Sequence, residues 1–159
     1  SPHVFLGTIE EFQGFEGQFD VVTFNFTIEC CAEPRTVMRR AWELLKPGGH
    51  VFICTGARVM APITRTLDTY LSGRPTDTHP LRFSLSSIAN FCAATGFIPS
   101  DSAIYMDVGL LTQLGRKPSS AEDGEKVKTF TPKIADWQAV IKFFDQWHGL
   151  GPGPAEPRD

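Results

Sequence analysis

The chain has 159 residues, a formal net charge of −3 and 42% hydrophobic residues. This length suits one domain, and the apolar share is enough for a hydrophobic core, which argues against a wholly disordered chain. The mild negative charge argues against a strongly basic nucleic-acid binder. No apolar run approaches the roughly 18 residues of a membrane span, and the first residues lack the layout of a signal peptide. We therefore expect a cytoplasmic protein with neither a nucleic-acid nor a membrane partner.

The cysteine pattern favours reduced thiols. The four cysteines stand at positions 30, 31, 54 and 92, and no C-x-x-C pair occurs. Cys54 and Cys92 lie in apolar runs, where a thiol behaves as a small hydrophobe. The four histidines are scattered, so we expect no metal site.

The first predicted elements form a βαβ unit. Residues 19–26 are mostly β-branched and aromatic without strict alternation, which predicts a strand buried on both faces of a parallel sheet. Glu33-Pro34 begins a predicted helix, and Lys46-Pro47-Gly48-Gly49 ends it. Residues 50–55 then predict a second buried strand. The two strands should be parallel with a right-handed crossover.

Further elements follow at a looser spacing. Apolar residues predict a short amphipathic helix over 63–71, followed by a polar loop to Pro80. Ser84 is the expected cap of another helix, which ends at Gly96. Residues 103–106 and 110–115 predict an antiparallel hairpin.

The C-terminal part is expected to differ from this domain. We divide the chain into a partial domain at 1–117, a polar linker at 118–128, an amphipathic helix at 129–149 and a disordered Pro/Gly tail at 150–159. The apolar stripe of that helix consists of Ile134, Trp137, Val140, Ile141 and Phe144. It either packs on the parent sheet, which is the favoured interpretation, or docks another subunit.

Two motifs carry a family resemblance. Phe19-Asp20-Val21-Val22, followed at the right spacing by Leu45-Lys46-Pro47-Gly48-Gly49, resembles the class I S-adenosylmethionine-dependent methyltransferases over about residues 4–117. The resemblance implies an α/β fold, a partial Rossmann-like sheet of parallel strands plus a C-terminal antiparallel hairpin, with flanking helices. It also implies S-adenosylmethionine as cofactor and a small-molecule methyl acceptor.

The candidate site lies at the strand ends. In open α/β sheets, ligands bind outside the carboxyl ends of the strands, so these ends should converge on one crevice. The first strand offers Asn25, Phe26 and Thr27, and the second offers Thr55, Gly56 and Arg58. The Phe26 ring could cover a sulfonium through its face. With Thr8 and Ile9, which resemble the family's adenine-contacting segment, the expected cofactor contacts are Thr8, Ile9, Asn25, Phe26 and Thr27, and the expected substrate contacts are Cys30, Gly56 and Arg58.

Glu29 is the catalytic candidate. It could act as a general base or hold an amine or hydroxyl of the substrate, and the alternative is a solvated turn carboxylate. Where the family carries a His next to this Glu, the chain has Cys30, which removes a group that titrates near neutral pH. A different hypothesis makes this chain another kind of α/β enzyme with Cys30 as its nucleophile, although no His neighbour is evident to activate the thiol.

The middle of the chain carries the remaining substrate prediction. We expect the loop over 60–82 to cover the substrate. The arginines in or beside this loop indicate an anionic or carboxylate group on that substrate or, more commonly, simply face solvent. They are Arg58, Arg65, Arg74 and Arg82.

The resemblance also predicts an incomplete cofactor site. The family's glycine-rich loop after strand one should precede Gly7 by roughly 50 residues, and no such loop stands in the printed sequence. The first predicted strand would then leave an open apolar sheet edge. We therefore expect either a fragment or truncated methyltransferase that binds S-adenosylmethionine poorly alone, or a non-catalytic interaction or dimerisation module. Its partner would be the missing N-terminal half or a second copy in a homo-oligomer.

Overall fold

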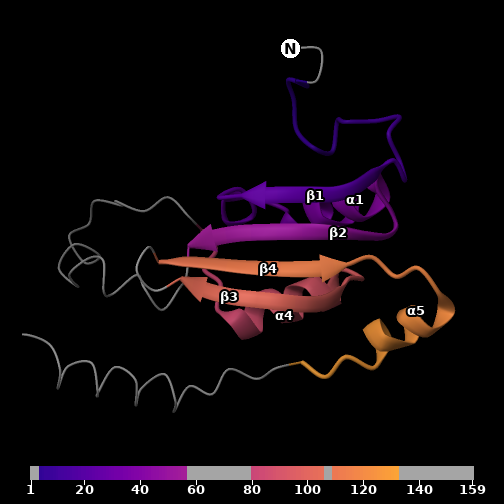
Figure 1. Cartoon of the computed structure of the whole chain (residues 1–159). Coiled ribbons are helices and arrows are strands. Elements are labelled where there is room, and N and C mark those ends of the chain that lie inside the picture. The colour runs from indigo at the N-terminus through magenta and orange to yellow at the C-terminus, as the bar shows by residue number, and fades with distance from the viewer. Residues whose placement is uncertain (1–3, 57–79, 106–108, 133–159) are drawn as a thin grey trace, which may run out of the picture.

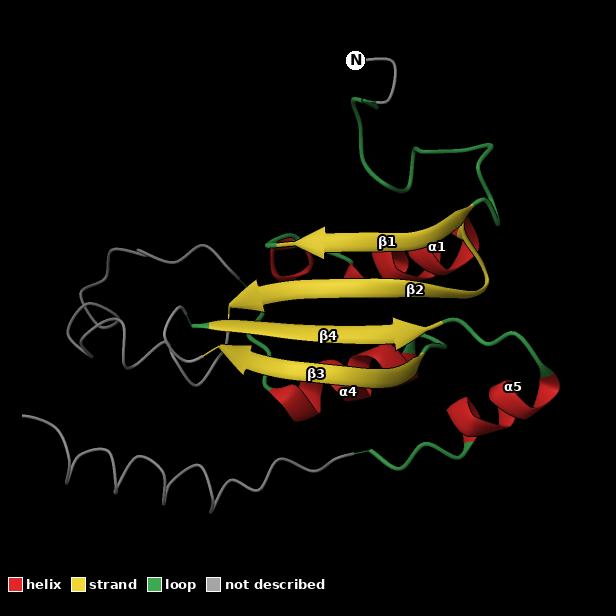
Figure 2. Ribbon diagram, viewed as in Figure 1, coloured by secondary structure: helices red, strands yellow, loops and turns green. Residues whose placement is uncertain are grey.

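A computed structural model describes residues 4–56, 80–105 and 109–132. Within these ranges, four strands form one mixed sheet in the order β1-β2-β4-β3 (Figure 2). The strands are β1 (Phe19–Asn25), β2 (Leu45–Gly56), β3 (Ile98–Tyr105) and β4 (Leu110–Arg116). β1 and β2 are parallel, whereas β4 runs antiparallel to both β2 and β3. The predicted partial Rossmann-like sheet is thus confirmed.

The βαβ unit forms where the sequence predicted it. Helix α1 (Pro34–Leu44) begins with proline at its first turn, where the missing N–H has no helical partner to lose. In the β1–β2 register, Val22 lies opposite Val51 and Phe24 lies opposite Ile53. The predicted parallel pairing between residues 19 and 55 is therefore confirmed.

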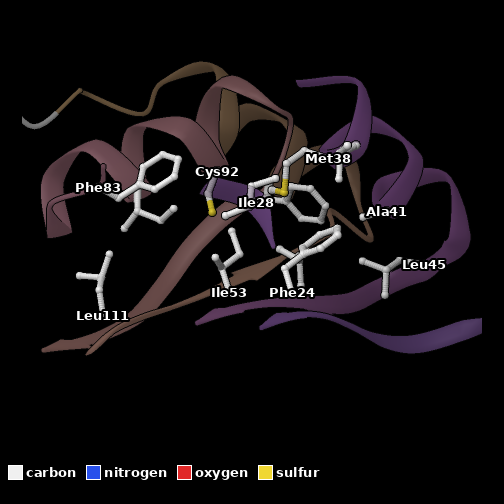
Figure 3. Close-up of a cluster of buried hydrophobic side chains, with 13 residues drawn as sticks. Phe24, Ile28, Met38, Ala41, Leu45, Ile53, Phe83, Cys92 and Leu111 are labelled. Carbon is white, nitrogen blue, oxygen red and sulfur yellow. The ribbon is translucent and has the colours of Figure 1, made fainter. Parts of the chain in front are cut away.

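Helices α1 and α4 (Leu85–Ala94) cover the same face of the sheet (Figure 1). Figure 3 shows the core between them and the strands, with Phe24, Ile53 and Leu111 pointing toward the helices. Ser84 caps α4 as predicted, because its hydroxyl accepts from Ser87 N at 3.2 Å while Ser84 N donates to Ser87 Oγ at 2.8 Å. None of the described helices is long and apolar enough to cross a membrane.

The opposite face of the sheet is not covered by α1 or α4. The strand register places Thr23, Phe52 and Leu114 side by side on that face. Val21 shares it and is 51% exposed. The strand at 19–26 was predicted to be buried on both faces, but among the described residues helices cover only one face of it, and Val21 and Thr23 on the other face are exposed.

Four boundaries differ from the predictions. Residues 121–128, expected in the linker, form helix α5 (Ala121–Lys128), which Ser120 caps by accepting from Asp123 N at 3.2 Å. β2 begins at Leu45 rather than His50, because Leu45 pairs with Phe19 at the start of β1, before a register irregularity between Phe19 and Val21. β3 begins at Ile98, five residues before the expected hairpin strand. The last helix was predicted to begin at residue 129, but residues 129–132 are not helical and Thr129 instead caps the end of α5. The predicted helix at 63–71, residues 133–149, most of the loop before Pro80 and the tail lie outside the described residues.

Candidate functional site

The carboxyl ends of β1 and β2 lie side by side. Asn25 pairs with Cys54 in the register, and Phe26 N donates to Cys54 O at 2.8 Å. Gly56 ends β2 at the same edge, while Arg58 lies outside the described residues. The predicted meeting of the two strand ends is therefore present.

Phe26 has an unusual backbone conformation. Its φ of 50° lies in the left-handed region, which a bulky non-glycine residue rarely adopts. The Thr27 hydroxyl donates to Asn25 O at 2.9 Å and holds the turn that follows. The Phe26 side chain is 53% exposed, so the turn presents an aromatic ring at the ligand edge of the sheet. Strained residues cluster at binding sites, where the surrounding structure maintains them.

Glu29 is buried, contrary to the alternative of a solvated turn carboxylate. It lies in the short helix η1 (Ile28–Cys30), which Ile28 anchors by inserting fully into the core. Glu29 is 2% exposed, and its backbone carbonyl accepts from Leu81 N at 3.3 Å. No described residue hydrogen-bonds its Oε2 atom. The fold therefore encloses a carboxylate at the end of β1 and leaves one oxygen without a donor.

The thiols around Glu29 are poor nucleophiles. Burial raises the pKa of Cys31 and of Cys54, and the charge of Glu29 contributes in the same direction to both. The Cys31 thiol also donates to Thr27 O at 3.3 Å. Cys30 is exposed, and no hydrogen bond of its thiol occurs among the described residues. Among the described residues no hydrogen bond or ion pair reaches the Cys30 thiol that could activate it, so the Cys-nucleophile hypothesis gains no support.

The N-terminal loop that carries Thr8 and Ile9 is held by α1. Thr8 N donates to the Glu11 carboxylate at 2.9 Å, and Phe12 N donates to Ile9 O at 3.3 Å. Ile9 packs against the core cluster, and the charge of the neighbouring Glu10 contributes to the raised pKa of Cys31. The loop therefore lies near the η1 turn, although no hydrogen bond among the described residues joins Thr8 to the ends of β1 and β2.

Arg40, which binds this N-terminal loop to α1, was not singled out from the sequence. Arginine side chains are ordinarily exposed. Arg40 on α1 is nevertheless 5% exposed and donates to Phe12 O, to Glu16 Oε1 at 2.7 Å and to Glu43 Oε2 at 2.9 Å. The partners that bury it stand up to 28 residues away, so helical periodicity alone could not reveal it.

The burial of Lys117 was not predicted from the sequence either. It is 8% exposed and donates to Trp42 O at 2.7 Å and Leu45 O at 2.8 Å, with its ammonium 3.8 Å from the Trp42 ring centroid. These bonds satisfy carbonyls at the C-terminal end of α1. Lys117 thus stabilises the fold rather than the site.

A hollow lies away from the strand ends. It has a volume of about 300 Å³ and lies between α1 and the end of α4, lined by Arg35, Thr36, Arg39, Ala94 and Thr95. None of the predicted site residues lines it. Among the described residues, no cluster of His, Cys, Asp or Glu could hold a metal ion.

The mixed sheet, its helices on one face and the joint strand ends define a Rossmann-like α/β domain with a ligand edge. A family model described as a methyltransferase domain matches residues 7–98, which is more than half of the chain. The chain belongs to the class I S-adenosylmethionine-dependent methyltransferases.

Relatives with known names match only segments of this chain. A ubiquinone biosynthesis O-methyltransferase from Erwinia tasmaniensis is 45% identical over 49 residues, which are 30% of this chain and 20% of that protein. The matching protein from Escherichia coli O127:H6 is 43% identical over 49 residues, with the same coverage of 30% and 20%. The chain therefore spans about a fifth of the length of these relatives.

Solved structures of low sequence identity share the fold, and one of them is a methyltransferase with bound ligands. The 1,6-didemethyltoxoflavin-N1-methyltransferase of Burkholderia thailandensis, solved with 1,6-didemethyltoxoflavin and S-adenosylhomocysteine, is 20% identical with a TM-score of 0.51. The match covers 69% of this chain and 48% of that one. This similarity shows the fold alone.

Proposed function

We propose that this chain is the C-terminal part of a small-molecule methyltransferase domain and supplies the acceptor side of its active site. The observation that carries this proposal is the pair of adjacent strand ends with strained Phe26 and buried Glu29, in a chain of this family. The reaction moves a methyl group from a sulfonium to an oxygen, nitrogen or carbon of the acceptor. Its rate depends chiefly on positioning and on exclusion of water.

Each predicted site residue has a role in this proposal. The exposed Phe26 ring fits a sulfonium, because aromatic faces attract cations. Asn25 and Thr27 supply polar groups beside it, and Thr8 with Ile9 forms the side facing the adenine. Glu29 is the catalytic residue that contacts the acceptor. Cys30, Gly56 and Arg58 are the remaining substrate contacts.

The described residues fit only part of the cofactor. Neither β1 nor β4 is followed by a glycine-rich loop that leads into a helix. The backbone N–H groups of such a loop ordinarily bind the anionic group of a cofactor. Within residues 4–56, 80–105 and 109–132, β1 pairs only with β2 and neither α1 nor α4 covers the opposite face of the sheet, and both observations support the same proposal of an incomplete domain. We also place the protein in the cytoplasm, a proposal supported by its four free thiols.

A second candidate function is a methyltransferase-derived interaction module that forms homo-oligomers. The open edge of β1 favours it, since an unpaired apolar strand is a template for pairing with another chain. Half-exposed Val21 on this strand adds apolar surface. The two functions differ in whether the site binds the cofactor when the rest of the domain is present.

Thermal shift with S-adenosylhomocysteine separates these functions. The chain alone should show no change in Tm at ligand concentrations up to ~1 mM, because a ligand stabilises only a state that binds it. A longer chain that includes the upstream half of the domain should gain Tm, and Phe26→Ala should reduce that gain. A shift in the chain alone would contradict the incomplete site. No shift in the longer chain would favour the interaction module.

A further inference from the structure

The hollow between α1 and the end of α4 plays no part in the proposed methyl transfer. Its volume of about 300 Å³ lies at the lower end of the range of ligand pockets. Apart from Ala94, its lining is polar: two arginines supply positive charge and two threonines supply hydroxyls. The hollow therefore has the size and the polarity for a small anionic ligand.

The two arginines, Arg35 and Arg39, have no acidic partner. Both are exposed on α1 and stand four residues apart, so their side chains lie on the same side of the helix. In the part of the chain that the structure describes, neither guanidinium forms a hydrogen bond or an ion pair, whereas the neighbouring Arg40 is bound to Glu16 and Glu43. Like charges at this spacing repel each other, so the pair does not serve the stability of α1.

The threonines add hydrogen-bonding groups to the lining. Thr95 Oγ1 donates to Phe91 O at 2.8 Å and to Cys92 O at 3.0 Å, which leaves its lone pairs as acceptors. The Thr36 hydroxyl has no hydrogen bond among the described residues, so it remains available as a donor. The hollow thus combines two unpaired cations with an unused donor.

No carboxylate lines this hollow. The nearby acidic residues Glu10 and Glu43 line a smaller hollow of about 190 Å³, which shares Thr36 and Arg39 with the larger one. Glu43 is already bound to Arg40 at 2.9 Å. The positive charge of the larger hollow is therefore left for a ligand.

We propose that this hollow binds the phosphate group of a small ligand, with Arg35 and Arg39 on its oxygens and the Thr36 hydroxyl as a further donor. Each guanidinium offers two parallel N–H groups that match two oxygens of one anion. One such fork occupies both oxygens of a carboxylate. A phosphate monoester carries three acceptor oxygens and a charge of about −1.5 to −2 at pH 7, which suits two arginines better.

Titration of the ¹⁵N-labelled chain tests this site without any cofactor. We would add glycerol 3-phosphate, inorganic phosphate or acetate at constant ionic strength and follow the backbone amides of Thr36 and Thr95. Both phosphates should shift these amides along saturating curves. Acetate should bind about tenfold more weakly or less tightly still, because it can fill only one arginine fork.

Substitutions separate the arginine forks from charge alone. Arg35→Gln and Arg39→Gln should each weaken phosphate binding by about tenfold or more, because each removes a charge-assisted pair. Arg39→Lys should weaken it less, since lysine keeps the charge but not the fork. Lys128→Gln is the matched control: it removes one positive charge from an exposed residue of α5 that does not line the hollow, and it should leave the dissociation constant unchanged.

Three results would overturn the proposal: phosphate shifts that never saturate, acetate binding equal to that of phosphate, and phosphate binding indifferent to both arginines. Sedimentation of the chain with phosphatidylcholine vesicles that contain phosphatidic acid, without binding of glycerol 3-phosphate, would assign the phosphate to a lipid surface and overturn the small ligand. Because the site lies apart from the strand ends, phosphate binding that needs Arg35 and Arg39 would stand even if the longer chain failed to bind S-adenosylhomocysteine.

Discussion

At the scale of single residues, the fold separates the four cysteines by reactivity. Burial raises the pKa of Cys92 to about 12 from an ordinary 9.0, whereas Cys30 is exposed. At pH 8, this rise of three pKa units leaves Cys92 with about 1,000-fold less thiolate than a cysteine of ordinary pKa has. The thiolate is the form that reacts. We expect iodoacetamide to label Cys30 first and Cys92 only after unfolding, as measured by peptide mass spectrometry over time. In urea all four should react, and labelling of Cys92 at the rate of Cys30 in the folded chain would contradict the observed core.

The residues that the sequence did not reveal are polar and buried. Asn25, Phe26 and Thr27 could be placed at a strand end because the apolar run before them marks the strand. Arg40 and Glu29 could not be placed inside, because their burial depends on loops and strands distant in the sequence. Charged side chains are ordinarily exposed, so the default prediction fails where tertiary partners override it.

At the scale of elements, α5 should be held in place by one carboxylate that depends on pH. Hydrogen bonds from Arg116 and from Ser119 lower the pKa of Asp123 below its ordinary 3.8. The unfolded chain therefore takes up this proton more readily, so Asp123 stabilises the fold above pH 3.8 and loses that contribution as the pH falls. Amide exchange in α5 should accelerate relative to α4 from about pH 5 downward. Asp123→Asn should expose α5 amides at neutral pH and remove this extra slope, and an unchanged slope would refute the assignment.

Elements with local periodicity or caps were predictable, and those set by distant contacts were not. Pro34 and Ser84 mark two helix starts correctly, because capping chemistry lies within a few residues. The start of β2 at Leu45 depends on its pairing with Phe19 of β1. β3 begins in a stretch containing Pro99 that has no strand-like alternation. Helix α5 was missed because its composition is polar, although Ser120 and Asp123 form a capping pair.

At the scale of the whole molecule, the two edges of the sheet differ in their protection. β3 carries Pro99, a register irregularity between Pro99 and Ser102 and exposed polar residues, all of which hinder pairing with another strand. β1 contains no proline, and its only irregularity lies at its start, between Phe19 and Val21. Beside it, the Phe12 and Phe15 rings stack at 4.6 Å, with Phe15 42% exposed. The β1 edge is therefore the side on which we expect another strand to pair.

Self-association through this edge is open to direct measurement. The chain should form oligomers whose mass by light scattering rises with concentration. Val21→Lys should shift the population toward monomer, because a lysine on an exposed edge strand disfavours edge-to-edge pairing. Tyr105→Lys is the matched control on β3, since Tyr105 is 50% exposed against 51% for Val21, and it should leave the mass unchanged. A monomer at all concentrations, with strand content retained by circular dichroism, would contradict the open edge. Equal effects of both substitutions would show that charge alone, rather than the β1 edge, controls association.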